Sequence, residues 1–236
     1  RPKQRRPVGT SVQVNGKSGI CSDNADALGA SFVTGEVDKI EEISGGKKVI
    51  CKDGTEYETK TIILSGGAKH RKLEVPGEEA LAGSGVSYCA TCDGAFFRGR
   101  TVAVVGGGDV AVEDAIFLAG LCKKVYLIHR RDSLRAADSL QKKLMALPNV
   151  EILWNSEVTK IQGEDMVESL VVLRKQEKKE QVLEVNGVFI AVGILPNTES
   201  FRGLVDMDEK GYIMADESCI TSVPGIFAAG DIRKKA

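Results

Sequence analysis

The stretch that decides the fold is Thr101–Leu121, TVAVVGGGDVAVEDAIFLAGL, in which three glycines join two kinds of local structure. Thr101–Val105 is a short β-branched run of the kind that forms a buried strand. Asp109–Leu121 has apolar residues at helical spacing with good helix formers between them, so it predicts a helix. Gly106–Gly108 allow the tight turn by which a strand leads directly into a helix.

The alternation of strand and helix continues beyond this stretch. Val125–Ile128 predicts a second strand, and Leu134–Leu147 predicts a second helix. Asp132 or Ser133 would cap the start of that helix, and Pro148 would stop it. A strand, a helix and a strand in this order form a βαβ unit, whose strands are parallel. The sequence therefore predicts an α/β fold.

Two further regions are typical of small antiparallel meanders. One spans Ser31–Lys60 and contains Lys52–Thr55 (KDGT), a sequence that favours a hairpin turn. The other spans about Val150–Val185. We expect each of them to form a small sheet of its own.

The two meanders share a short internal repeat. Glu36–Ile40 (EVDKI) reappears 121 positions later as Glu157–Ile161 (EVTKI). Each meander is followed by an apolar strand that ends in glycine, Ile62–Gly67 in the first and Val188–Gly193 in the second. Chance is the alternative, since these residues are common, but ordered agreement at two places favours duplication. Two copies of a nucleotide-binding unit predict two Rossmann-like dinucleotide-binding domains, each with a small antiparallel meander.

The first copy of the repeat lacks a glycine-rich turn. In the second copy Gly106 precedes Glu157 by 51 residues, so the matching glycine of the first copy would fall before residue 1. Arg1–Asn24 contains no Gly-x-Gly-x-x-Gly after an apolar strand. We therefore expect that this chain lacks the front of its first domain.

The glycine-rich turn matches the dinucleotide-binding pattern Gly-x-Gly-x-x-Ala. The segment comprises Gly106, Gly107, Gly108, Asp109, Val110 and Ala111. The first glycine permits the turn, the second lets a pyrophosphate approach the backbone, and a small third residue lets the helix pack closely on the strand. The phosphates would then meet the free N–H groups at the helix start. A glycine-rich turn without a ligand is the alternative.

The end of the second predicted strand indicates which nucleotide binds. An NAD site would carry an acidic residue about 20 residues after the glycines to bind the ribose. This chain instead has His129, Arg130 and Arg131, followed by Arg135. Guanidinium groups bind a 2′-phosphate through paired charge-assisted bonds, so the sequence favours NADPH over NADH. A solvated basic surface is the alternative.

The segment just before the βαβ unit contains a Cys-x-x-Cys pair, Cys89 and Cys92, followed by Asp93. The spacing lets the two sulfurs reach each other in a first helical turn, where a thiolate is favoured. Asp93 could act as a general acid or base for the exchange. A pair of small buried residues is the alternative. A zinc site would need a second close cysteine pair or neighbouring histidines, and neither is present, so we predict no metal.

Composition excludes several classes of partner and location. The 236 residues include 32 Lys and Arg and 33 Asp and Glu, a net charge of −1. This balance provides no overall attraction to nucleic acid or to an acidic membrane. Because there is no apolar run near the roughly 18 residues of a membrane span, and no signal-peptide pattern, we expect a cytoplasmic protein without a membrane partner.

Four motifs together resemble one enzyme family. They are Cys89–Gly94 (CATCDG), Val104–Asp109 (VVGGGD), His129–Arg135 (HRRDSLR) and Gly225–Asp231 (GIFAAGD). The chain resembles the bacterial low-molecular-weight thioredoxin reductases, in which these motifs occur in the same order. The resemblance covers roughly Ala27–Lys235.

The resemblance implies a homodimeric NADPH- and FAD-dependent reductase whose partner is thioredoxin. It implies an NADPH domain, residues 85–217, that interrupts an FAD domain, residues 1–84 and 218–236. Cys89 and Cys92 would be the redox pair and Asp93 the acid. Gly106–Ala111 would hold the pyrophosphate, and the cluster of His129, Arg130, Arg131 and Arg135 would surround the 2′-phosphate. Of the residues near FAD, Gly230 and Asp231 would contact the sugar-alcohol and phosphate region, and Val37 and Gly67 would lie near the adenine and the linking phosphates.

The departures from the family pattern all concern FAD. The glycine-rich FAD motif is absent, Ser65–Gly67 stands where the family usually has Ala-Thr-Gly, and the sequence ends at Ala236. We therefore expect this chain to bind NADPH but to hold FAD weakly or not at all. The alternatives are a related reductase with another client, such as a peroxiredoxin- or ferredoxin-linked enzyme, and an NADP-binding fragment without turnover.

Overall fold

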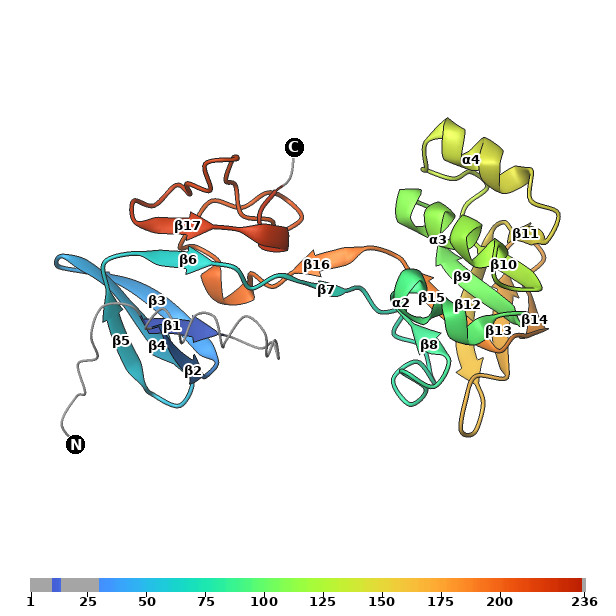
Figure 1. The fold of residues 1–236 in the computed structure, drawn as a ribbon, viewed down its shortest axis with the longest axis horizontal. Coiled ribbons are helices and arrows are strands. Elements are labelled where there is room, and N and C mark those ends of the chain that lie inside the picture. Colours follow the sequence, from blue (N-terminus) through green and yellow to red (C-terminus); the bar gives the residue numbers. More distant parts are fainter. Residues whose placement is uncertain (1–9, 14–29, 235–236) are drawn as a thin grey trace. The chain divides into compact units, whose positions relative to one another are not determined.

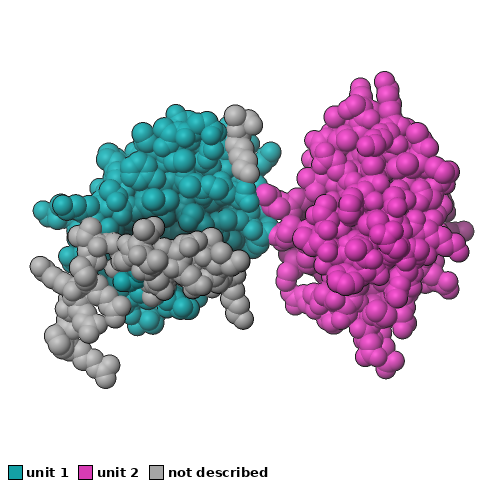
Figure 2. Space-filling view, viewed as in Figure 1, with its two compact units in different colours: residues 1–69, 195–236 teal, residues 70–194 magenta. Residues whose placement is uncertain are grey.

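The computed structural model describes residues 10–13 and 30–234, and these residues form two compact units. Unit 1 comprises Arg1–Lys69 and Leu195–Ala236, and unit 2 comprises His70–Ile194 (Figure 2). The sequence predicts an FAD domain over residues 1–84 and 218–236 and an NADPH domain over residues 85–217. These functional domains stay a prediction, since the two units are defined by compactness alone.

Unit 2 is built on a five-stranded parallel sheet (Figure 1). The strands lie in the order β11 (Val150–Leu153), β10 (Lys124–Ile128), β9 (Thr101–Gly106), β15 (Gly187–Ala191) and β8 (Val86–Ser87). Each neighbouring pair is parallel, which confirms the βαβ prediction. The helix α3 (Asp109–Ala119) connects β9 to β10 as the sequence predicts.

The central strand β9 supplies side chains to two hydrophobic cores. Val102 and Val104 pack with buried residues of α3 and α4 (Asp138–Met145) on one face of the sheet. Ala103 and Val105 pack on the other face with buried residues of an antiparallel sheet. Because both faces of β9 are buried, its sequence is a continuous apolar run rather than an alternating one.

The helix α4 is shorter than the sequence predicts, and the expected caps at Asp132 and Ser133 are wrong. The helix begins at Asp138, with Ala137 at its N-cap, instead of at Leu134. Leu134 and Ala136 are buried while their neighbours are exposed, which is the alternation of an extended segment. Backbone N–H groups of this segment bond to the glycine-rich turn, so they are not available for helical bonds.

Each unit contains one three-stranded antiparallel meander, as expected. In unit 1 it consists of β3 (Val37–Ile43), β4 (Gly46–Cys51) and β5 (Glu56–Thr59). In unit 2 it consists of β12 (Ser156–Gln162), β13 (Ser169–Arg174) and β14 (Lys179–Glu184). The predicted turn at Lys52–Thr55 is confirmed by the bond from Cys51 N–H to Thr55 C=O (2.9 Å) and by the positive φ of Gly54, 82°.

The repeated pentapeptide occupies the same structural place in both meanders. It lies at the start of β3 and of β12, and the register of each strand shifts at the same point, between Val37 and Lys39 and between Val158 and Lys160. Val37 and Val158 are both buried. A shared sequence with a shared bulge supports the duplication inferred from the sequence.

The rest of unit 1 consists of short parallel pairs and connecting strands. β6 (Ile62–Leu64) pairs with β17 (Ile226–Ala228), and β1 (Thr10–Gln13) pairs with β2 (Ser31–Thr34). β7 (Ala68–His70) pairs with β16 (Ile194–Pro196) where the chain passes between the units. No helix among the described residues is both long enough and apolar enough to cross a membrane.

Substituting Asn for Asp114 should stabilise the protein clearly more at pH 7.5 than at pH 4.5. Asp114 is partly buried in α3, and this burial, together with repulsion from Glu113, raises its pKa to about 6. The folded state therefore binds more protons than the unfolded state between about pH 4 and pH 6, so stability falls as pH rises through this range. Asp114→Asn should recover about 1–3 kcal/mol above that range.

Thermal unfolding at the two pH values measures this difference. Glu113→Gln removes a charge from an exposed position of the same helix, so it should change stability much less. Equal melting temperatures for Asp114→Asn and the parent chain at pH 7.5 would contradict the assignment.

Candidate functional site

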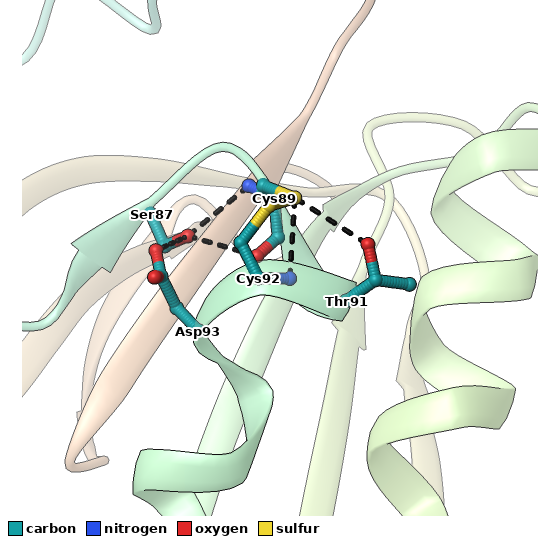
Figure 3. Close-up of a disulfide and its surroundings, with 5 residues drawn as sticks. All are labelled: Ser87, Cys89, Thr91, Cys92 and Asp93. Carbon is teal, nitrogen blue, oxygen red and sulfur yellow. Dashed lines mark hydrogen bonds between the residues drawn. A yellow bond between two sulfur atoms is a disulfide. The ribbon is translucent and has the colours of Figure 1, made fainter. Parts of the chain in front are cut away.

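The Cys89 and Cys92 sulfurs are joined in a disulfide directly after β8 (Figure 3). Cys89 is the N-cap of α2 (Ala90–Asp93) with extended backbone angles, and Cys92 is the third residue of that helix. The turn from strand into helix brings the two Cα atoms to 5.3 Å. The reach of the two sulfurs expected from their spacing is thus confirmed.

Two hydrogen-bond donors surround the sulfur of Cys89. The backbone N–H of Cys92 lies 3.2 Å from Sγ, and the Thr91 hydroxyl oxygen lies 3.4 Å from it (Figure 3). A disulfide sulfur carries no proton, so the Thr91 hydroxyl is the donor. Cys92 is exposed whereas Cys89 is half-buried. The same two donors can stabilise a thiolate at Cys89 after reduction.

The Asp93 carboxylate is held beside the disulfide by Ser87. The Ser87 hydroxyl donates to Asp93 Oδ2 at 2.6 Å, and its oxygen accepts the backbone N–H of Cys89 at 3.1 Å. Ser87 is buried at the end of β8, so this link has a fixed geometry. The arrangement keeps a proton acceptor next to the sulfur pair. Ser87 could not be predicted from the sequence, because nothing local distinguishes it from other serines.

A buried carboxylate anchors the residue before Cys89. Glu78 is 1% exposed and accepts the backbone N–H groups of Leu73 (3.0 Å) and Glu74 (2.7 Å) and the Tyr88 hydroxyl (2.7 Å). Burial, and then the bond to Glu78, raises the pKa of Tyr88 well above its usual value. The Tyr88 ring stacks on His70 at 5.4 Å between centroids. These contacts fix the backbone that leads into the disulfide.

The glycine-rich turn has the close packing that its pattern requires. A Cβ added at Gly106 would lie 2.5 Å from the Ala111 Cβ and 2.4 Å from the Ala191 carbonyl oxygen. Ala111 is fully buried, so α3 approaches β9 as closely as a small third residue allows. Gly108 is the N-cap of α3, and a Cβ there would meet nothing within 4 Å. The turn is thus open at the start of α3, where the first N–H groups have no partner within the helix.

The predicted arginine cluster lies next to this turn. Arg130, Arg131 and Arg135 are exposed on the segment that follows β10, and no ion pair joins them to another residue of the described ranges. The backbone N–H of Arg135 donates to the Gly107 carbonyl at 2.7 Å. The structure therefore brings together the glycines and the arginines that the sequence assigned to one nucleotide.

His129 is buried beneath the glycine-rich turn. It is 5% exposed, its Nε2 lies 3.0 Å from the Ser133 carbonyl oxygen, and its ring meets that of Trp154 edge-on. A Cβ on Gly107 would lie 2.2 Å from the imidazole. Burial lowers the pKa of His129, and Arg135 and Arg131 act in the same direction, while hydrogen bonds with the Ser133 and Gly106 backbone oppose the shift. The net effect favours the neutral ring. The predicted contact of His129 with a 2′-phosphate stays a prediction.

Two glycine turns predicted to contact FAD lie at one edge of the β6–β17 pair. The strands are parallel, with Leu64 opposite Ala228, and Ala229 N–H donates to the Leu64 carbonyl at 2.9 Å. Gly67 (φ 65°) and Gly230 (φ 77°) follow these strands, and a Cβ on either would meet nothing within 4 Å.

Asp231 and Val37 are the other two residues predicted to lie near FAD. Asp231 is exposed beside Gly230. The Val37 side chain is buried at the start of β3, so only the Val37 backbone could contact a cofactor. The residues present thus fit the approach of phosphates and a sugar to one side of a dinucleotide site. The expected lack of a glycine-rich motif concerns Arg1–Asn24, which lies outside the described residues except for β1.

Comparison with known proteins identifies the family. Residues 9–236 match the family described as "Pyridine nucleotide-disulphide oxidoreductase". The chain is 43% identical over 209 residues to a thioredoxin reductase of Streptomyces clavuligerus, and the matched region covers 88% of this chain and 65% of that protein. It is 44% identical over 215 residues to a thioredoxin reductase of Listeria innocua, covering 90% of this chain and 66% of that protein. The chain thus spans about two thirds of the length of these relatives.

The solved structures give the same result. The thioredoxin reductase structure from Streptococcus pyogenes superposes with a TM-score of 0.75 at 44% identity, over 91% of this chain and 70% of that one. The match extends over both units and includes the α/β fold with its parallel sheets and meanders. The chain therefore belongs to the pyridine nucleotide-disulphide oxidoreductase family and, within it, to the thioredoxin reductases.

Proposed function

We propose that this chain takes electrons from NADPH and passes them, through FAD, to the Cys89–Cys92 disulfide, which then reduces thioredoxin. One observation carries the proposal. The disulfide follows β8, the glycine-rich turn follows β9, and the arginine segment follows β10. These strands belong to one parallel sheet, so all three features lie at its carboxyl edge, where α/β proteins bind ligands.

The residues of unit 2 fit an NADPH molecule. The N–H groups at the start of α3 would bind the pyrophosphate, and Gly106–Ala111 would let it approach the backbone. The guanidinium groups of Arg130, Arg131 and Arg135 would bind the 2′-phosphate. In unit 1, the edge formed by Gly67, Gly230 and Asp231, with the backbone of Val37, would contact FAD. When bound, the two cofactors supply the two electrons that reduce the disulfide.

The chemistry of the chain's own residues is thiol–disulfide exchange. Two electrons and two protons convert the Cys89–Cys92 disulfide into two thiols. The Cys89 thiolate, stabilised by the donors of Cys92 and Thr91, attacks one sulfur of the client disulfide. The client S–S bond breaks, a mixed disulfide forms, and one client thiolate leaves. The Cys92 thiolate then attacks the Cys89 sulfur, which restores the Cys89–Cys92 disulfide and releases the second client thiolate.

Asp93 handles the protons of this exchange. Its carboxylate follows Cys92 directly and is held by the Ser87 hydroxyl. From that place it can accept the proton of the Cys92 thiol and return it to the departing thiolate. Ser87 and Glu78 hold the chain that leads into Cys89 in position while this happens.

Exposed aromatic residues near the disulfide favour a protein as the client. Phe96 is 78% exposed, and Phe117 is 41% exposed. A Cβ on Gly94 would lie 3.1 Å from the Phe117 ring, so Phe117 is adjacent to the helix that carries the sulfurs. Exposed aromatic side chains are typical of protein interfaces. The relatives named above are thioredoxin reductases, which favours thioredoxin as the client. The homodimer that the sequence resemblance implies stays a prediction.

A single-turnover reaction tests the client half of this proposal. The full chain is reduced with dithiothreitol, freed of reductant and mixed with oxidised thioredoxin. We expect one thioredoxin disulfide to be reduced per chain, because Cys89–Cys92 is the one disulfide of the residues that the structure describes. A glutaredoxin and a peroxiredoxin, each oxidised, serve as comparison clients. Faster reduction of either of these than of thioredoxin would contradict the assigned client.

A further inference from the structure

The arginine segment, Arg130–Ala137, follows β10 and forms two hydrogen bonds with the glycine-rich turn. One joins two backbone groups, Arg135 N–H and the Gly107 carbonyl, at 2.7 Å. The other uses a side chain, because the N–H of Ala137 donates to Asp109 Oδ1 at 2.8 Å. Asp109 is the first residue of α3, so its carboxylate reaches from the helix start across to this segment.

The two halves of the segment depend on different contacts. Its first half is fixed by other contacts. Asn155 N–H donates to the Arg131 carbonyl (3.0 Å), His129 Nε2 lies 3.0 Å from the Ser133 carbonyl oxygen, and the His129 ring packs directly beneath Gly107. Its second half, Arg135–Ala137, precedes α4, and Gln141 Nε2 of that helix donates to the Ala136 carbonyl at 2.7 Å. The bonds to Gly107 and Asp109 are its hydrogen bonds to the glycine-rich turn. Loss of the Asp109 bond would therefore release Arg135 more than Arg130 or Arg131.

The charge of Asp109 cannot itself favour NADPH. A carboxylate at the start of α3 would repel the pyrophosphate, and NADPH and NADH carry the same pyrophosphate. The carboxylate would also repel the 2′-phosphate, which only NADPH carries. Any influence of Asp109 in favour of NADPH must therefore act through another group that contacts this phosphate. The bond to Ala137 provides this route, since it holds the segment that carries Arg135.

We propose that Asp109 is a positioning residue for coenzyme choice, which holds Arg135 at the 2′-phosphate position by accepting the Ala137 N–H. The inference rests on the proposed binding of NADPH by unit 2. An arginine that is already positioned loses less conformational freedom when it binds a phosphate. Without the bond, NADPH would have to order the segment itself, whereas NADH binding would be unaffected by that order.

Two substitutions remove the bond from opposite ends. Asp109→Ala removes the acceptor together with its charge. Ala137→Pro removes the donor and leaves the charge, and the φ of Ala137, −56°, suits proline. Asp109→Asn is the matched control, because its amide oxygen can still accept the bond although the charge is gone.

Titration of the full chain with NADPH and with NADH gives the ratio of the two dissociation constants. We expect the preference for NADPH to fall about tenfold in Asp109→Ala and in Ala137→Pro. Asp109→Asn should keep the preference of the parent chain, while both coenzymes bind somewhat more tightly because a repulsive charge has been removed. In Arg135→Ala chains, the added Asp109→Ala change should have little further effect on the ratio.

An unchanged preference in Asp109→Ala or in Ala137→Pro would overturn the inference, as would an Asp109→Asn chain that behaves like Asp109→Ala. The affinity for NADH shows whether each variant is folded. If Asp109→Ala does not fold, the preference for NADPH is compared between Asp109→Asn, which keeps the bond, and Ala137→Pro, which lacks it. The proposed function fails separately, if the parent chain does not prefer NADPH or if substitution of Arg130 and Arg131 leaves that preference intact.

Discussion

Replacing Arg130 and Arg131 together with alanine should weaken NADPH binding by one to a few orders of magnitude and leave NADH binding nearly unchanged. Each arginine would make a charge-assisted contact with the 2′-phosphate worth about 1.5–3 kcal/mol, and about 1.4 kcal/mol is tenfold in affinity. Both side chains are exposed, so their removal leaves the cores of unit 2 intact. Calorimetric titration with each coenzyme measures the effect.

The matched control removes two positive charges elsewhere on the same unit. Lys142 and Lys143 are exposed on α4. Their replacement by alanine changes net charge by the same amount, so it should leave the affinity for NADPH within a factor of about two to three at physiological salt. Equal losses for NADPH and NADH in the double arginine variant would contradict the assignment of a 2′-phosphate site.

The Cys92→Ser variant should trap oxidised thioredoxin as a stable mixed disulfide, whereas Cys89→Ser should not. In Cys92→Ser the Cys89 thiolate keeps both of its donors, because the N–H of residue 92 belongs to the backbone and Thr91 is unchanged. The attacking step therefore proceeds, but no second thiolate is present to resolve the mixed disulfide. Non-reducing electrophoresis and mass spectrometry of the complex measure its yield.

Cys219 provides the control for this experiment. It is a partly exposed free cysteine of unit 1, and its replacement by serine should not change the yield of the trapped complex. A complex formed by Cys89→Ser but not by Cys92→Ser would reverse the roles of the two sulfurs. The absence of a complex in both would contradict exchange with thioredoxin.

Much of unit 2 could be predicted from the sequence because its signals are local. The apolar run of β9, the glycines and the start of α3 lie within Thr101–Leu121, and both meanders follow from a repeat and a turn pattern. The start of α4 could not be predicted. The segment before it carries helix formers, but its backbone groups bond to Gly107 and Asp109, which lie almost thirty residues away in the sequence.

In the candidate site, too, residues with a local sequence pattern could be predicted and residues that depend on tertiary packing could not. Cys89, Cys92 and the glycines of the turn were found because their spacing is itself the signal. Ser87 and Glu78 have no such pattern, since their importance comes from burial and from hydrogen bonds to Asp93 and to Tyr88. His129 was grouped with the arginines by its charge type, yet its ring lies in the core, where burial favours the neutral form. Burial of a single side chain depends on tertiary packing that spacing does not reveal.

The electron path from NADPH to the disulfide is tested most directly by counting thiols. Because the sequence predicts that FAD is held weakly or not at all, the full chain is incubated with NADPH and a large excess of FAD, so that even a weak FAD site is filled. The incubation is anaerobic, and the chain is then denatured and labelled with a maleimide. We predict two more labelled cysteines than in the untreated chain, mapped to Cys89 and Cys92, which form the one disulfide of the described residues. An unchanged count in a chain from which dithiothreitol does release the two thiols would contradict the account.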